Sequence, residues 1–437
     1  MDEEPPQPDD PGRDHTAAQN KRARTDSDTS TSVESLESTR TLESEDLEFI
    51  NEHERVYGNQ SYYMPCDQSE QDRLTIQHQV FVYALKGQLT TTKVTPLTSR
   101  ILDLGTGPGH WAVAMAQRYP HAEVVGVDMA VWDIETTEED GGTGRVTWEI
   151  DDLDVWGVEE EMDELTSRLE TYNPFRDPAA RNLTESPSRS RLRDPESQSQ
   201  SPSITLPESG PSFNPYMLEP EVQPGWHFSQ PFDLVHLRAM RGTFAYWEDV
   251  YAEIYNNLRP GGWIEIADYE LVLPEMPNST SQPGETTDDA PMHPGQQLPF
   301  AALIKLYKSM MEASFKSGRP LGTYYMHPTY LEDAGFKDIR TTFVNVPVGQ
   351  WPEDEEQRKI GKMFLIILLE SLEPHSLRLL TRHGDAEKIW SAEEVRECVE
   401  LCKKEILDWS EGLVDERRRE GWCANFKWII GRKSKNA

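Results

Sequence analysis

Glycines and acidic residues between positions 100 and 130 have the types and spacing of a ligand-binding site. The stretch begins with an apolar run, continues as Asp103-x-Gly105-x-Gly107-x-Gly109, and ends on a second apolar run before Asp128. Glycine allows positive φ and close approach of the backbone to a ligand, and the first turn of a following helix offers free N–H groups. An acidic residue about 20 positions further on can accept hydrogen bonds from ribose hydroxyls. The pattern therefore predicts a β-turn-α-β unit that binds a nucleoside.

Two classes of cofactor share this arrangement, and the residues around the glycines separate them. A dinucleotide fingerprint, G-x-G-x-x-G counted from Gly105, needs glycine at position 110, where this chain has His110. The Asp103 carboxylate would repel a pyrophosphate, whereas it would attract a cationic amino acid. S-adenosylmethionine carries an α-ammonium and a sulfonium group, so the sequence favours it as the cofactor.

A third buried strand, expected at residues 145–150, supplies the adenine end of the predicted site. It is followed by Asp151, Asp152 and Leu153. An acidic side chain at this strand end can accept a hydrogen bond from the adenine amino group, while the next backbone N–H donates to the ring. Asp152 is the first choice for this role and Asp151 is the alternative.

Strand and helix patterns alternate along the rest of the chain, which is typical of a doubly wound parallel sheet. A buried strand, FDLVHLR, starts at Phe232, and an amphipathic helix at 247–258 leads into RPGGWIEIADYE. Ligands of such sheets bind beyond the carboxyl ends of the strands, so His236 is the candidate general base for an oxygen acceptor. Later elements are expected as helices at 300–316, 354–373 and 391–410, and as strands in FKDIRTTFVNVPV and NFKWIIGRKS.

Composition limits how much of the chain can fold into a core. The 437 residues carry a formal net charge of -34, and only 36% of them are hydrophobic. We therefore expect a disordered acidic tail at 1–45 and flexible inserts at about 159–224 and 274–298, with a lid segment at 46–98 and the main domain at 99–433. A surface this acidic repels nucleic-acid phosphates and anionic membranes, so neither is an expected partner.

Short sequence signals bear on metal binding and location. The four cysteines lack the paired spacing of a metal finger, so no metal is expected. The N-terminus has no signal-peptide pattern, and the longest apolar run, 363–369, is far shorter than the ~20 residues that span a bilayer. We expect an intracellular protein, and the basic cluster of Lys21, Arg22 and Arg24 favours the nucleus slightly over the cytoplasm.

The lid segment combines tyrosines with a helical pattern. Tyr62 or Tyr63 is predicted to close over the cofactor. The helix that follows has Asp67 as its expected N-cap. Its apolar face is predicted to consist of residues at three-to-four spacing, namely Leu74, His78, Phe81 and Leu85.

Six stretches of the chain are similar to a known family: YYMPCDQSEQDRLTIQH, LDLGTGPGHWA, VVGVD, WEIDDLD, PFDLVHLR and LRPGGWIE. They resemble the class I S-adenosylmethionine-dependent methyltransferases and, within these, the fungal LaeA-like family of secondary-metabolism regulators. The resemblance covers residues 50–158 and 225–433. It implies an α/β fold with a seven-stranded Rossmann-like sheet, helices on both faces, and an antiparallel last strand at 425–431. It also implies that Asp103, Gly105 and Gly107 surround the methionine part of S-adenosyl-L-methionine, Asp128 the ribose, and Asp152 with Leu153 the adenine. The predicted cofactor-binding residues further include Thr106, Gly109, Met129 and Asp151.

Two functions follow from these patterns. The first is an enzyme that transfers a methyl group from S-adenosylmethionine to a small-molecule or protein acceptor, a reaction that mainly requires the reactants to be held in line and water to be excluded. The second is a cofactor-binding nuclear scaffold with little turnover, for which the resemblance implies velvet-type regulatory partners. The genomic neighbourhood would discriminate, because a position inside a biosynthetic gene cluster favours a tailoring enzyme and an isolated locus favours a regulator.

Overall fold

The structure, a computed structural model, describes residues 49–132, 146–155, 225–273, 300–411 and 421–436. It also describes the backbone of two short strands, β1 (Lys21–Arg24) and β2 (Thr39–Thr41). The predicted inserts at 159–224 and 274–298, and the rest of the predicted tail at 1–45, lie outside the described residues.

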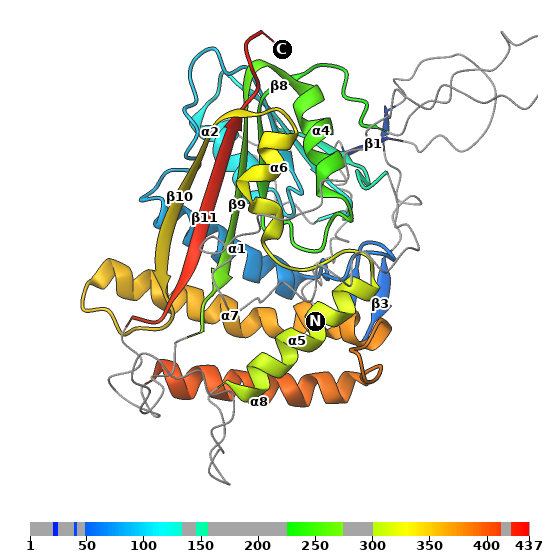
Figure 1. Ribbon diagram of the computed structural model, residues 1–437, viewed down its shortest axis with the longest axis vertical. Coiled ribbons are helices and arrows are strands. Elements are labelled where there is room, and N and C mark those ends of the chain that lie inside the picture. Colours follow the sequence, from blue (N-terminus) through cyan, green and yellow to red (C-terminus); the bar gives the residue numbers. More distant parts are fainter. Residues whose placement is uncertain are drawn as a thin grey trace, which may run out of the picture.

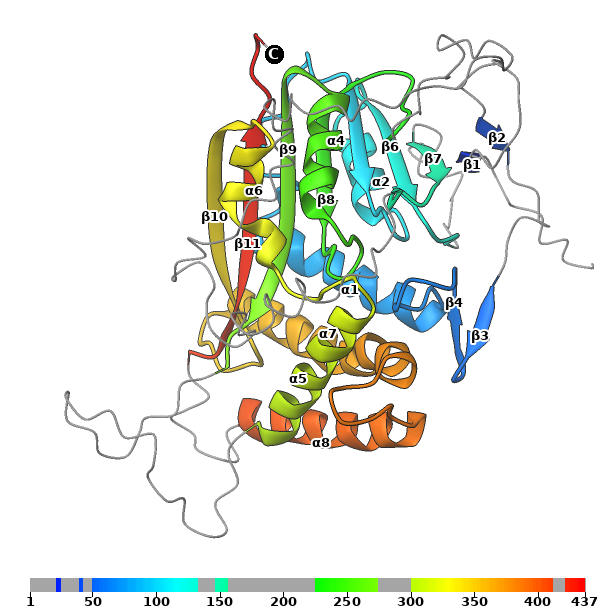
Figure 2. The same cartoon turned by 45° about the vertical axis from the view of Figure 1, so that its right-hand side comes forward.

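One mixed sheet organises the chain, and its order is β10-β11-β9-β8-β5-β6-β7-β1-β2 (Figures 1 and 2). Strand β5 pairs in parallel with β6 and β8, whereas β11 runs antiparallel between β9 and β10. The seven strands from β10 to β7 confirm the predicted sheet and its antiparallel last strand, and β1 and β2 extend it beyond β7. These seven are β5 (Arg100–Leu104), β6 (Glu123–Asp128), β7 (Val146–Ile150), β8 (Phe232–Arg238), β9 (Leu258–Leu271), β10 (Lys337–Pro347) and β11 (Cys423–Arg432).

The central strands are buried on both faces, which explains why they read as continuous apolar runs. Ile101 packs in a cluster with Trp111 of α2 (His110–Arg118), which connects β5 to β6. The next residue, Leu102, belongs to a different cluster with Trp247 and Ile254 of α4 (Trp247–Asn257), which connects β8 to β9. Because neighbouring residues of a strand point to opposite faces, α2 and α4 cover opposite faces of the sheet.

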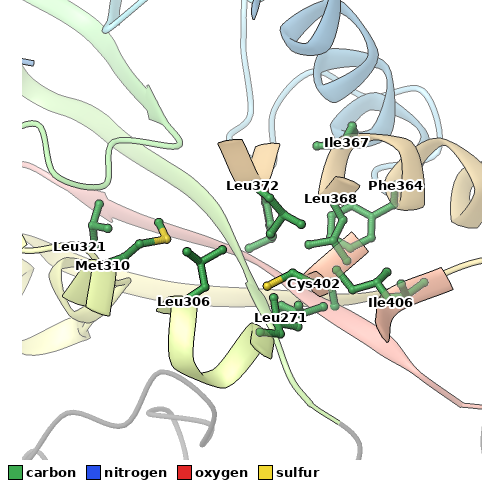
Figure 3. Close-up of a cluster of buried hydrophobic side chains, with 14 of the residues drawn as sticks. Leu271, Leu306, Met310, Leu321, Phe364, Ile367, Leu368, Leu372, Cys402 and Ile406 are labelled. Atoms are coloured by element: carbon green, nitrogen blue, oxygen red, sulfur yellow. The ribbon is translucent and has the colours of Figure 1, made fainter. Parts of the chain in front are cut away.

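A layer of helices lies beyond the carboxyl ends of β9 and β10 (Figure 1). It contains α1 (Gln68–Ala84), α5 (Ala301–Lys316), α7 (Glu355–Arg382) and α8 (Ala392–Ser410). Figure 3 shows how side chains from α5, α7 and α8 meet the end of β9 in one apolar core. This core fixes the helical layer against the sheet edge where ligands of such folds bind. The remaining elements are β3 (Ile50–Glu52), β4 (Arg55–Tyr57), η6 (Tyr324–Met326) and α6 (Pro328–Asp333).

Helix α7 is longer than the sequence predicts, because it continues past the expected end at residue 373 and through Pro374. Proline removes one helical hydrogen bond and usually ends a helix. Here Pro374 is buried between Leu372 and Leu377, and the Ser376 hydroxyl donates to the Leu372 carbonyl at 2.6 Å. The apolar packing of the residues on both sides of the proline therefore outweighs the loss of one helical hydrogen bond.

Within the described part of the chain, no helix has the length and apolar character that crossing a membrane would need. The same residues contain no group of three or more His, Cys, Asp or Glu side chains that could hold a metal ion.

Candidate active site

The glycine loop between β5 and α2 forms one wall of a cavity at the carboxyl ends of the strands. Gly105 and Gly107 have φ of +66° and +55°, values that favour glycine. A Cβ on Gly105 would overlap the sulfur of Met240, whereas a Cβ on Gly107 would meet only Leu74, at 4.0 Å. The side of Gly107 that lacks a Cβ therefore leaves space next to the backbone, as a closely bound ligand requires.

Asp128 ends β6 and lies beside this loop. Its Oδ2 accepts a hydrogen bond from the Gly107 N–H at 2.8 Å, and its Oδ1 accepts one from the Ala130 N–H at 2.9 Å. These bonds fix the carboxylate where it lines the cavity. The predicted glycine loop and the predicted ribose-binding acid therefore form one hydrogen-bonded unit.

The residues after β7 line the same cavity, together with Met129. The Asp151 N–H donates to the Asp128 carbonyl at 3.1 Å, and Asp152 accepts from the Asp154 N–H at 3.1 Å. The carbonyl of Leu153 accepts a hydrogen bond from the Trp226 indole at 2.9 Å. The structure thus brings the predicted adenine end next to the predicted ribose end.

Two predicted residues do not lie on the cavity wall. A Cβ on Gly109, which has φ of +83°, would overlap the Trp148 ring, so this glycine serves close packing. His236 is 1% exposed, stacks on Trp111 at 3.7 Å between ring centroids, and lies behind Asp103. Its Nδ1 lies 2.8 Å from Oδ1 of Asp103, while Oδ2 of Asp103 accepts from the Thr106 hydroxyl at 2.7 Å. The predicted general base therefore contacts Asp103, which itself lines the cavity, instead of an acceptor.

Helix α1 forms the opposite wall with polar side chains that the sequence prediction missed. Asp67 is confirmed as the N-cap of this helix, because it accepts from the Glu70 N–H at 3.1 Å. The buried face, however, includes Glu70, Arg73 and Gln77. Arg73 makes two hydrogen bonds to Glu70, at 2.6 and 2.9 Å, and one to Gln77 at 2.8 Å. The missed signal was this polar stripe at helical spacing. The expected apolar face also exists in part, because Phe81 is buried and Leu74 and Leu85 pack against apolar clusters, whereas His78 contacts Arg238.

A second ion pair faces the cavity from the sheet side. Arg241 follows β8 and makes two hydrogen bonds to Asp268 of β9, at 2.7 and 3.1 Å. Asp268 also accepts from the Tyr325 hydroxyl at 2.6 Å and is 1% exposed. Arg241 and Asp268 both line the cavity. This pair was also missed, because its members are 27 residues apart and meet only through the sheet.

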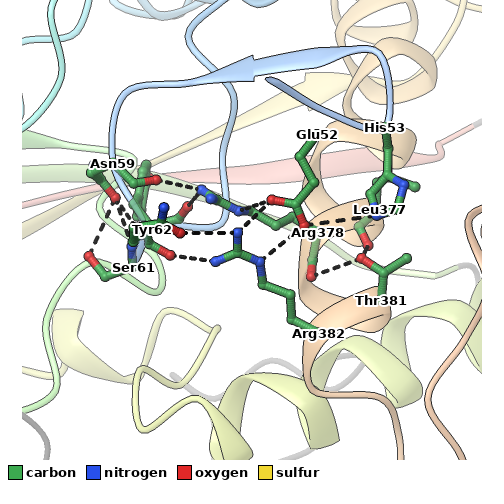
Figure 4. Close-up of polar contacts among 10 residues, drawn as sticks. Glu52, His53, Asn59, Ser61, Tyr62, Leu377, Arg378, Thr381 and Arg382 are labelled. Atoms are coloured by element: carbon green, nitrogen blue, oxygen red, sulfur yellow. Dashed lines mark hydrogen bonds and ion pairs between the residues drawn. The ribbon is translucent and has the colours of Figure 1, made fainter. Parts of the chain in front are cut away.

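The predicted lid residues Tyr62 and Tyr63 line the cavity in a segment, residues 58–66, that we call the strap. Figure 4 shows the strap tied to α7. Nη1 of Arg378 donates to the carbonyls of Asn59 and Tyr62, at 2.8 and 2.7 Å, and its Nε donates to Glu52 at 3.0 Å. Arg382 also pairs with Glu52, at 2.6 Å. We call Glu52, Arg378 and Arg382 the arginine clasp.

Burial controls the ionisation of the groups around the strap. It raises the pKa of Tyr62 and Tyr63 above the ordinary value, so both are neutral phenols at neutral pH. Burial also lowers the pKa of His375, and the charges of Arg73 and Arg241 lower it further, well below its ordinary value. Because of this low pKa, His375 is a neutral imidazole. Its side chain lines the cavity from α7.

Comparison with known proteins agrees with the geometry of this site. Residues 76–300 match a family model described as a methyltransferase domain, and this match covers just over half of the chain. The chain therefore belongs to the methyltransferase-domain family, and it is an S-adenosylmethionine-dependent methyltransferase.

Individual relatives make the likeness more specific. The chain is 29% identical over 354 residues to the secondary metabolism regulator LAE1 of Cochliobolus heterostrophus, covering 79% of this chain and 84% of the relative. It is 25% identical over 371 residues to the protein-methionine methyltransferase laeA of Emericella nidulans, covering 84% and 74%. It also overlaps a solved phosphoethanolamine N-methyltransferase 2 of Haemonchus contortus in complex with S-adenosyl-L-methionine, at 15% identity and a TM-score of 0.31, covering 86% of this chain and 55% of that one. This last likeness is too weak to support any inference.

Proposed function

We propose that this chain transfers the methyl group of S-adenosylmethionine to an uncharged acceptor, the thioether of a protein methionine. The main observation behind this proposal is that two carboxylates on the acceptor side of the cavity, Glu70 and Asp268, are already paired with arginines. The transfer takes place by attack of a sulfur lone pair on the methyl carbon, with the bonding electrons leaving on the sulfur of S-adenosylhomocysteine.

The glycine-loop wall is assigned to the cofactor. Asp128 accepts hydrogen bonds from the ribose hydroxyls, and Asp152 with Leu153 contacts the adenine. Gly105 and Gly107, with Thr106 between them, bring the backbone close to the amino-acid end. The fit is supported by the open space beside Gly107 and by the confinement of the Asp128 carboxylate through backbone N–H groups.

The opposite wall is assigned to the acceptor. Its charged groups form two closed pairs, Glu70 with Arg73 and Arg241 with Asp268, each joined by two hydrogen bonds. A carboxylate or ammonium acceptor would lose its hydration there without gaining a free counter-charge, which is costly. An uncharged acceptor avoids this cost.

Among the described residues of this wall we find no strong base, which favours sulfur over oxygen. A hydroxyl must lose a proton during methyl transfer, and a base within hydrogen-bond reach assists that step. His375 is a weak base because its pKa is far below the ordinary value, and His236 lies behind Asp103. A thioether has no proton to lose. Its product is a sulfonium cation, which the ring faces of Tyr62 and Tyr63 can stabilise.

The names of the relatives support the same assignment. One is named a protein-methionine methyltransferase, and others are named regulators of fungal secondary metabolism. We therefore propose that the chain acts in the regulation of fungal secondary metabolism. A nuclear location and velvet-type partners belong to the same proposal, and the basic cluster on which the location rests lies in β1, where only the backbone is described.

The test is methyl transfer from trideuteromethyl-labelled S-adenosylmethionine to peptides that differ only in one central residue: methionine, lysine or glutamate. The full-length protein is used, and mass spectrometry locates the label. We expect label on methionine alone, and none with the Asp128→Ala variant. Label on lysine or glutamate would contradict the uncharged acceptor. Cofactor binding without transfer to any peptide, or to the protein itself, would support the scaffold function instead.

A further inference from the structure

Two polar side chains on the acceptor wall, Gln77 of α1 and His375 of α7, carry hydrogen-bonding groups that no described residue satisfies. Both side chains line the cavity, and the two helices that carry them pack against each other. Gln77 is only 5% exposed. Native proteins pair nearly all of their buried polar groups, so unsatisfied groups on a cavity wall indicate a ligand that completes them.

Arg73 fixes the orientation of the Gln77 amide. Nη1 of Arg73 donates to Oε1 of Gln77 at 2.8 Å, while its Nε and Nη2 donate to Glu70. A guanidinium can only donate, so the oxygen of the amide is the atom that faces Arg73. Among the described residues, none accepts a hydrogen bond from Nε2 of Gln77. Gln77 therefore offers uncharged N–H donors that suit a carbonyl oxygen.

The His375 ring supplies a hydrogen-bond acceptor. It makes an edge-to-face contact with the Tyr63 ring, at 6.3 Å between centroids, and neither ring nitrogen has a hydrogen-bond partner in the described part of the chain. Burial, with the charges of Arg73 and Arg241, lowers the pKa of His375 and keeps the ring neutral. A neutral imidazole has one protonated nitrogen and one bare nitrogen that accepts. His375 therefore offers an acceptor that suits an N–H group.

Arg73 lies beside both groups, since it bonds to Gln77 and its charge acts on His375. An uncharged donor and an uncharged acceptor match the peptide unit, whose carbonyl accepts and whose N–H donates.

We propose that Gln77 donates to a backbone carbonyl next to the acceptor methionine, and that the bare nitrogen of His375 accepts from the backbone N–H of this methionine. The pair selects a methionine within a peptide over the free amino acid, whose ammonium and carboxylate would lose their hydration at this wall. The inference rests on the proposed function, because it names residues that recognise the same acceptor.

The test changes one atom of the acceptor. Two peptides carry the same central methionine, but in the second an ester oxygen replaces the N–H of this residue. With trideuteromethyl-labelled S-adenosylmethionine and the full-length protein, we expect kcat/KM to be about fivefold or more higher for the amide peptide, because the ester loses one hydrogen bond. His375→Phe keeps an aromatic ring beside Tyr63 but has no nitrogen, so the two peptides should then differ by less than twofold. His383→Phe, just after the end of the same helix, is the matched control and should keep the preference.

A second variant tests the donor. Gln77→Glu keeps an oxygen for Arg73 but replaces the N–H donors with an acceptor. We expect KM for the amide peptide to rise about tenfold or more, because a peptide carbonyl loses its donor. The affinity for S-adenosylhomocysteine, measured by calorimetry, should stay within twofold. Gln88→Glu, at an exposed position after α1, is the control for the added negative charge.

The outcomes separate this recognition from the proposed function. Equal use of the amide and ester peptides by the unmodified protein would overturn the proposal, and this comparison needs no variant to fold. A preference that persists in His375→Phe would overturn the contact of His375. An unchanged KM in Gln77→Glu, or a parallel loss of affinity for S-adenosylhomocysteine, would overturn the contact of Gln77. Label on neither peptide would instead refute the proposed methyl transfer to methionine.

Discussion

Nδ1 of His236 lies 2.8 Å from Oδ1 of Asp103, on the adjacent parallel strand, and both side chains are almost fully buried. The His236 ring is stacked flat on Trp111, with 3° between the two ring planes. The imidazole therefore fixes the carboxylate from behind, at the point where that carboxylate meets the cavity. We propose that His236 acts on the reaction through Asp103, as a positioning residue.

This relationship predicts different effects for two substitutions of His236. Asparagine can place an amide N–H near the position of Nδ1, so His236→Asn should keep most of the affinity for S-adenosylhomocysteine and most of the turnover. His236→Ala leaves a buried carboxylate oxygen without its partner and should lose about 1–3 kcal/mol of stability. Calorimetry and methyl-transfer rates check both variants. A His236→Asn protein that binds the cofactor normally but transfers no methyl group would show that His236 is a base after all.

A second prediction concerns two glycines with the same backbone conformation. Gly87 and Gly109 both have φ of +83°, but a Cβ on Gly87 meets nothing within 4 Å, whereas one on Gly109 overlaps Trp148. Gly87→Ala should cost about 1–2 kcal/mol for the left-handed conformation alone. Gly109→Ala should cost about 1–3 kcal/mol more because of overpacking. Denaturant unfolding measures both, and equal losses would show that the contact with Trp148 does not constrain this position.

From the arginine clasp we predict that the cavity opens at the strap. Replacing Arg378, whose side chain is 1% exposed, with methionine leaves the carbonyls of Asn59 and Tyr62 without their donor. Hydrogen exchange of the strap amides should then become at least tenfold faster, and cofactor affinity should fall. Arg382→Met is the matched comparison, since this side chain is 32% exposed, and its effect should be smaller. Unchanged exchange in the Arg378 variant would mean that other contacts hold the strap.

A pH prediction follows from Asp385, which accepts hydrogen bonds from the Lys388 N–H, the Trp390 indole and the Ser309 hydroxyl. Burial raises the pKa of this carboxyl, but the hydrogen bonds outweigh burial and lower the pKa from 3.8 to about 2. Because the folded-state pKa is depressed, the ionised group stabilises the fold above its unfolded-state pKa, and this contribution is lost as pH falls toward 2. The stability advantage over Asp385→Asn should therefore shrink between about pH 5 and pH 2. An advantage independent of pH would contradict the assignment.

The positions of the glycine loop and of Asp128 agree with the sequence prediction because they depend on a local pattern; their roles in cofactor binding stay a prediction. Gly105, Gly107 and Asp128 belong to one β-turn-α-β unit, whose order along the chain already fixes their geometry. The role of His236 as a base stays a prediction. The sequence could not show that its ring stacks on Trp111 behind Asp103, because a strand residue can face either layer of the fold.

Some contacts around the cavity depend on residues that are distant in the sequence. Arg241 lies after β8 and pairs with Asp268 of β9, and Arg378 meets Glu52 across 326 residues. Asp67 was found because a helix N-cap acts within one turn of its own position.

The central claim, that the cavity beside the glycine loop binds S-adenosylmethionine, is tested most directly by titrating S-adenosylhomocysteine into the full-length protein and its Asp128→Ala variant. The account predicts one site per chain in the unmodified protein. It predicts a loss of about 1.5–3 kcal/mol of binding free energy in a folded Asp128→Ala protein, because charged hydrogen bonds to the ribose are lost. Equal affinity of the two folded proteins, or no binding to the unmodified one, would contradict it.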